Sequence, residues 1–136
     1  MTYSREDLDA ELFGALDDCL MEGEYYIPLD YKTRGSPPNE GDSEKYYQTQ
    51  LEAYSLLLAE NGYKPKDYAY LVYYYPKEVR SDGVVIFNIK PVKVEIDINR
   101  ARSLFEDAVA LLKGPMPGHH SECEHCSWIS SRTAYE

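Results

Sequence analysis

The chain has 136 residues, of which 43% are hydrophobic, and carries a formal net charge of −10. This length suits one small domain, and no apolar run approaches the roughly 18 residues that indicate a membrane-spanning helix. The acidic balance argues against a basic surface that coats nucleic acid without regard to sequence, because Lys and Arg make most phosphate contacts. A local site in which acid-bound cations supply the positive charge remains open.

Residues 1–7 are polar and lack the pattern of a signal peptide. We therefore expect a cytoplasmic protein that does not cross a membrane. Three cysteines in such a chain favour free thiols or metal ligands over a framework of disulfides.

The elements expected in the first half, in chain order, are a helix at 4–10, strands at 12–20 and 25–33, a loop at 34–43 and a helix from 43 to 61. Ser4 is the candidate N-cap of the first helix. The turn Met21-Glu22-Gly23-Glu24 would close the two strands into a hairpin. Asp42 or Ser43 would cap the long helix, and Gly62 would stop it.

The second half predicts strands at 68–75 and 84–96 and a helix at 99–113. Pro76 should end the first strand, and Lys90-Pro91 within the second indicates a sheet edge or a bulge. Gly114-Pro115-Met116-Pro117-Gly118 breaks the helix. Its expected buried side consists of Leu104, Phe105, Ala108, Val109, Leu111 and Leu112.

This order of elements, β-β-α-β-β-α followed by a tail, predicts an α/β (α+β) fold. We expect a mixed central sheet of about four strands flanked by helices. We divide the chain into a domain at 1–114 and a tail at 115–136 that contains cysteine and histidine.

An acid and a lysine stand at the end of the second expected strand, in Leu29-Asp30-Tyr31-Lys32-Thr33. Side chains at i and i+2 of a strand point to the same face, so Asp30 and Lys32 should lie together. The hairpin would place Asp17 opposite about residues 28–30. Asp17, Asp30 and the backbone carbonyl of Tyr31 are oxygen ligands of the kind that Mg²⁺ prefers. Two carboxylates and a lysine are the minimum set for metal-assisted phosphodiester hydrolysis, and the alternative is an ordinary surface acid–lysine pair.

A glutamine lies on the apolar stripe of the long helix. Gln50 and Tyr54 are four residues apart and therefore share a helix face. A glutamine that faces a core needs a polar partner. The alternative is that Gln50 lies at the margin of the stripe, where water serves it.

Three motifs in this order resemble the PD-(D/E)XK nuclease superfamily, in its RecB-like branch, which includes CRISPR adaptation nucleases. Gly14-Ala15-Leu16-Asp17 resembles the G-x-(I/L)-D motif of that family. Leu29-Asp30-Tyr31-Lys32-Thr33 resembles its V-D-Y-K-T motif, and Gln50-Leu51-Glu52-Ala53-Tyr54 resembles its Q-x-x-x-Y helix. The resemblance extends from about residue 12 to residue 75.

The resemblance implies a restriction-endonuclease-like core in which Asp17 and Asp30 bind Mg²⁺ or Mn²⁺ and Lys32 is catalytic. It also implies that Gln50 and Tyr54 orient the site or contact DNA. The leading hypothesis is a metal-dependent DNA nuclease, an exonuclease on single-stranded or frayed DNA. Two alternatives are a catalytically weak nuclease-fold module that binds a partner protein, and a small metal-binding regulator.

The tail contains all three histidines and two of the three cysteines. The Cys-x-x-Cys spacing of Cys123 and Cys126 suits zinc or iron–sulfur ligation. RecB-like nucleases that hold a 4Fe-4S cluster have three C-terminal cysteines and one near the N-terminus, whereas Cys19 here indicates a packed thiol. One hypothesis is therefore a zinc or degenerate iron–sulfur site at Cys123 and Cys126 with His119 or His120. The other is a tail that binds no metal.

Overall fold

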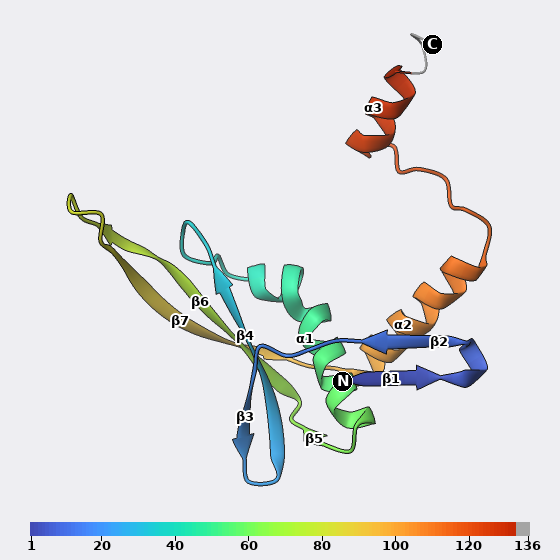
Figure 1. Ribbon diagram of the computed structural model, residues 1–136, viewed down its shortest axis with the longest axis horizontal. Helices are drawn as coiled ribbons and strands as arrows, with labels where there is room; N and C mark the ends of the chain where they lie inside the picture. The colour runs from blue at the N-terminus through green and yellow to red at the C-terminus, as the bar shows by residue number, and fades with distance from the viewer. Residues whose placement is uncertain (133–136) are drawn as a thin grey trace.

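Residues 1–132, which the computed structural model describes, form a mixed sheet, a small two-stranded sheet and three α-helices (Figure 1). The elements are β1 (Thr2–Arg5), the 3-10 helix η1 (Glu6–Leu8), β2 (Ala10–Phe13), β3 (Asp18–Glu22), β4 (Tyr25–Thr33), α1 (Asp42–Glu60), β5 (Lys64–Pro65), β6 (Tyr68–Val79), β7 (Val85–Glu95), α2 (Ile98–Lys113) and α3 (Glu124–Arg132). The expected mixed α/β fold class is confirmed. No helix within residues 1–132 has the length and apolar character that crossing a bilayer requires.

The central sheet has the strand order β3-β4-β6-β7, with β5 beside β4. β3 pairs antiparallel with β4 across the turn at Gly23, whose φ of 62° is in the left-handed region that glycine tolerates. β4 and β6 are parallel, so the chain must cross over between them, and α1 is that crossover. The pairs Asp30↔Leu71 and Lys32↔Tyr73 place the two polar residues on the same face as a buried leucine and a buried tyrosine.

The helix α1 is buried on two sides, between the central sheet and an outer layer of β1, β2 and α2. One core cluster joins α1 to the sheet and consists of Leu51, Ala69, Leu71, Tyr73 and Val94. A second cluster joins α1 to the outer layer and consists of Tyr3, Leu56, Leu57 and Ala101. A helix with apolar residues on opposite sides must be covered on both, so the position of α1 determines the arrangement of the other elements.

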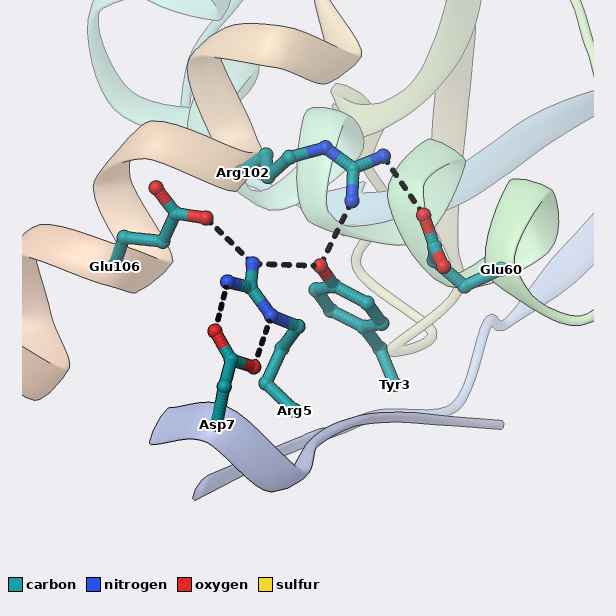
Figure 2. A network of polar contacts seen from close by, with 6 residues as sticks. All are labelled: Tyr3, Arg5, Asp7, Glu60, Arg102 and Glu106. Atoms are coloured by element: carbon teal, nitrogen blue, oxygen red, sulfur yellow. Dashed lines mark hydrogen bonds and ion pairs between the residues drawn. The ribbon is translucent and has the colours of Figure 1, made fainter. Parts of the chain in front are cut away.

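A polar network connects β1 to both α1 and α2 (Figure 2). Arg5 of β1 pairs with Glu106 of α2 at 2.5 Å. The hydroxyl of Tyr3 accepts hydrogen bonds from Arg5 and Arg102, and Arg102 pairs with Glu60 of α1 at 2.7 Å. Hydrogen bonds from its guanidinium to Asp7 above all, and to Tyr3 and Glu106, raise the pKa of Arg5 above its usual value. The N-terminal strand is therefore bonded to residues about a hundred positions away in the sequence.

The helix predicted at residues 4–10 is wrong. β1 and β2 form an antiparallel hairpin, and only Glu6–Leu8 makes a short 3-10 turn, which ends at Asp9 with a φ of 45°. Ser4 caps no helix, because its hydroxyl donates across the hairpin to Glu11 at 2.9 Å. Pairing with a partner strand and burial of Tyr3 outweigh the local capping pattern.

The strand predicted at 12–20 is interrupted. β2 ends at Phe13 and β3 begins at Asp18, so Gly14–Asp17 is a connection outside both strands. A Cβ atom at Gly14 would lie only 2.9 Å from Cδ1 of Leu57, which shows how closely the backbone crosses α1 there. In contrast, the strand predicted at 25–33 is confirmed with the same bounds as β4.

The predicted capping of α1 is wrong at the start and confirmed at the end. Gly41, with a φ of 80°, occupies the N-cap position, and no side chain caps the helix. The Asp42 carboxylate instead accepts from the backbone N–H of Asn39 and pairs with Arg34 at 2.7 Å. The helix ends at Glu60, and Gly62 follows with a φ of 84°.

Two proline predictions have opposite outcomes. β6 does not end at Pro76 but continues to Val79, with a register shift between Pro76 and Glu78 that accommodates the proline. β7 lies at the edge of the sheet, so the missing N–H of Pro91 is tolerated, as the sequence indicated.

The predicted buried side of α2 is largely wrong. Asp97 caps the helix by accepting from the N–H of Asn99, and the helix ends at Lys113 before Gly114, as expected. Ala101 and Val109 are buried, whereas Leu104, Leu111 and Leu112 are 47%, 58% and 85% exposed. The described residues supply α1 and the N-terminal hairpin for α2 to pack against, and these cover only part of its apolar side. α3 lies away from the rest of the fold (Figure 1), and the last four residues of the predicted tail lie outside the described range.

Leu51→Ala should lower the free energy of unfolding by about 2–5 kcal/mol, because Leu51 is fully buried between α1 and the sheet. Urea denaturation followed by far-UV circular dichroism measures the change. Leu112→Ala on α2 is the matched control and should change stability by less than about 0.5 kcal/mol. Equal losses in the two variants would contradict the described core.

Candidate functional site

Asp30 and Lys32 lie on the face of β4 that α1 covers. The side chain of Asp30 is 2% exposed and that of Lys32 is 20% exposed. Lys32 Nζ lies 2.6 Å from Asp30 Oδ2. A buried carboxylate requires a partner of opposite charge or several hydrogen bonds, and the i, i+2 spacing along β4 supplies the ammonium.

Gln50 of α1 completes the network. Its Oε1 accepts a hydrogen bond from Lys32 Nζ at 3.0 Å. Its Nε2 donates to Asp30 Oδ1 at 3.1 Å and to the hydroxyl of Tyr54 at 2.7 Å. The structure therefore brings together four of the side chains singled out in the sequence. Gln50 faces these partners and does not lie at a solvated margin of the helix.

Asp17 contacts β4 through a hydrogen bond to the backbone of that strand. It lies immediately before β3 and is exposed. Because β3 pairs with β4 in the register Asp18↔Leu29, Asp17 falls beside Asp30. Its Oδ2 accepts a hydrogen bond from the backbone N–H of Tyr31 at 3.2 Å. The side chain of Tyr31 lies on the opposite face of β4, where its hydroxyl donates a hydrogen bond to Asp18 Oδ2 at 3.1 Å.

Two carboxylates, those of Asp17 and Asp30, are the candidate ligands for a hard divalent cation. Asp30 Oδ2 is buried and makes no hydrogen bond of regular geometry, so its one close partner is the Lys32 ammonium. Asp17 and Asp30 provide carboxylate oxygens of the kind that Mg²⁺ and Mn²⁺ prefer. Residues 1–132 contain no group of three or more acidic, histidine or cysteine side chains that could hold a metal. Mg²⁺ is usually bound by one or two protein carboxylates, and water and substrate oxygens fill its other coordination positions.

Sequence reasoning missed a residue that contacts the site, Tyr47. The ring of Tyr47 lies 4.7 Å from Lys32 Nζ, in cation–π geometry, and it also packs against Tyr73. Its position three residues before Gln50 places it on the same face of α1, and this spacing is the signal that could have identified it.

The structure does not assemble the metal site that the sequence suggested in the tail. Cys123 and Cys126 lie together, since the backbone N–H of Cys126 donates to Cys123 Sγ at 3.5 Å. His120 Nδ1 instead accepts from the backbone N–H of Glu122. No third ligand joins the two cysteines in the part of the chain that is described, so zinc or iron–sulfur ligation at His119, His120, Cys123 and Cys126 has no support here.

A protein-family model for the PD-(D/E)XK nuclease superfamily matches residues 3–131. Comparisons with curated proteins and with solved structures found no match. The family match spans nearly the whole chain, including the two acids, the lysine and the Gln50–Tyr54 helix. It supports the resemblance at the level of the superfamily and does not distinguish one branch from another.

Gln50→Ala should destabilise the fold by about 1–3 kcal/mol, because it leaves the buried Asp30 and Lys32 without their amide partner. Gln48→Ala is the matched control on the same helix, since Gln48 makes one exposed hydrogen bond to the Glu95 carbonyl. It should cost less than about 1 kcal/mol. Urea denaturation compares the two variants, and a Gln50→Ala protein as stable as wild type would refute the network.

Proposed function

The chain belongs to the PD-(D/E)XK nuclease superfamily, and on this premise we propose that it is a metal-dependent deoxyribonuclease. It hydrolyses phosphodiester bonds of single-stranded or frayed DNA and acts as an exonuclease. The observation that supports this most strongly is the buried Asp30 carboxylate, which has one oxygen without a hydrogen bond beside an ammonium.

Asp17, Asp30 and the backbone carbonyl of Tyr31 are the proposed metal ligands. Members of this superfamily typically use divalent metals. A bound Mg²⁺ or Mn²⁺ ion supplies Lewis-acid chemistry, polarising the phosphoryl oxygen and lowering the pKa of a coordinated water. Asp17 is exposed, so a phosphate group can approach from that side without disturbing the core.

Lys32 is the proposed catalytic cation. Its ammonium lies beside Asp30 and is held by Gln50 Oε1, so it is already oriented when substrate arrives. Its charge stabilises the negative charge that develops on the phosphoryl oxygens as water attacks. Gln50 and Tyr54 are positioning residues. Because the Gln50 amide nitrogen donates to Asp30 and Tyr54, its oxygen is left to face Lys32.

We also place the chain in the RecB-like branch, which contains the CRISPR adaptation nucleases, and propose DNA processing as its role. The support is the order and spacing of the motifs at Asp17, Asp30–Lys32 and Gln50–Tyr54. The cytoplasmic location and the division into 1–114 and 115–136 remain predictions.

The alternative is a nuclease-fold module with weak catalysis that binds a partner protein. The exposed leucines of α2, Leu104, Leu111 and Leu112, favour it. Cleavage of DNA by the purified chain separates the two proposals.

With Mg²⁺ or Mn²⁺, the protein should degrade end-labelled single-stranded DNA, and chelator should stop the reaction. Lys32→Ala should lower the rate by about 10²–10³, because it removes the cation beside the acids. Lys64→Ala, at an exposed pair with Glu24, is the control and should leave the rate unchanged. Folded protein that cleaves no DNA or RNA in either metal would defeat the proposal, as would an unaffected Lys32→Ala variant.

Asp17→Asn and Asp30→Asn should each weaken Mn²⁺ binding by more than about tenfold, because each removes a charged ligand. Isothermal titration calorimetry measures the affinity without any need for catalysis. Asp107→Asn, on an exposed position of α2, is the control. Unchanged Mn²⁺ affinity in both site variants would place the metal elsewhere.

A further inference from the structure

A pair of thiols stands at the start of α3, apart from the site described above. Cys123 immediately precedes the helix, and Cys126 is its third residue. Side chains three positions apart on a helix are neighbours, with Cβ atoms about 5–6 Å apart. Because Cys123 precedes the helix, a small change in its backbone brings the pair within the Cβ separation of a disulfide, about 3.5–4.5 Å. Both cysteines are free and only partly buried.

The two cysteines contact each other through side chain and backbone. The backbone N–H of Cys126 donates to Cys123 Sγ at 3.5 Å. His125, which lies between them in sequence, stacks its ring on Trp128 at a centroid distance of 6.3 Å. Within residues 1–132, no third cysteine, histidine or acid joins the pair to make a metal site. Two adjacent thiols can be oxidised to a disulfide by exchange with another disulfide.

Access to the pair is unobstructed. α3 lies away from the central sheet and from α1 (Figure 1), so a small oxidant reaches the sulfurs without any opening of the fold. The pair lies on an element that is separate from the sheet that carries Asp30 and Lys32 (Figure 1). Its oxidation can therefore be measured apart from the proposed nuclease activity.

We propose that Cys123 and Cys126 form a redox-active dithiol that exchanges with low-molecular-weight disulfides. In the first step the Cys123 thiolate attacks one sulfur of the small disulfide, a new S–S bond forms, and the first small thiolate leaves. In the second step Cys126 loses its proton to solvent and attacks Cys123 Sγ, and the second small thiolate leaves. Two electrons pass from the dithiol to the small disulfide, which becomes two thiols by taking up two protons.

The geometry assigns the attack to Cys123. Its sulfur accepts a backbone N–H and lies at the N-terminal end of a helix. Both features stabilise a thiolate, which is the nucleophilic form. Cys126 then resolves the mixed disulfide from the first turn of the same helix. Cys19 provides a contrast, because it is distant in sequence and burial raises the pKa of its thiol.

The test uses the full chain in a buffer of reduced and oxidised glutathione. The count of free thiols should fall from three to one, and peptide mapping should link Cys123 to Cys126. Cys126→Ser should accumulate a mixed disulfide with glutathione at Cys123. Cys123→Ser should react more slowly by about tenfold, because the favoured thiolate is gone. Cys19→Ser is the control and should still lose two thiols.

Three results would overturn the proposal. One is a wild-type chain that keeps all three thiols in oxidising buffer. Another is equal rates of modification at Cys19, Cys123 and Cys126. The third is stoichiometric binding of added Zn²⁺ that protects both tail thiols from glutathione disulfide, which would assign the pair to a metal. None of these measurements depends on DNA cleavage, so failure here leaves the proposed nuclease function untouched.

Discussion

The burial of the Asp30 carboxylate is the constraint on which the rest of the structure depends. A charge that is 2% exposed is costly unless it is paired and hydrogen bonded. Lys32 provides the charge from the same strand, and Gln50 provides one hydrogen bond from α1. Gln50 reaches Asp30 only if α1 lies across β4 in one rotation about its axis. That rotation directs Leu51 into the sheet and Leu57 toward the outer layer.

The parts of the fold that could be predicted are those governed by local chemistry. β4 was predicted with its correct bounds because an apolar run ends at a polar, proline-rich loop. The end of α1 was predicted because glycine commonly follows a helix in the left-handed conformation, and Gly62 adopts that conformation. The hairpin of β1 and β2 could not be predicted in this way, since Tyr3 and Arg5 find their partners about a hundred residues later. For α2, the sequence pattern identifies the apolar side of the helix, but it does not reveal how much of that side a neighbouring element covers.

The candidate site was predictable to a similar degree. The convergence of Asp30 and Lys32 follows from strand periodicity alone, and the facing of Gln50 and Tyr54 follows from helix periodicity. The approach of Asp17 depended on the register of a hairpin whose turn could be identified in the sequence. The spacing of Tyr47 and Gln50 on one face of α1 could have identified Tyr47 as well. The close passage of Gly14 against Leu57 depends on packing between elements, which no local pattern encodes. The chemical roles of these residues remain predictions.

The separation of α3 from the rest of the fold has a spectroscopic consequence. The one tryptophan of the sequence, Trp128, lies on α3, with Arg132 over its ring. Most of the tyrosines instead lie in the central sheet and α1, where Tyr73 is fully buried and Tyr47 packs beside it. Tryptophan emission therefore reports the environment of the tail, whereas near-ultraviolet tyrosine signals report the packing of the core. A melting curve recorded at the wrong wavelength would measure the wrong part of the molecule.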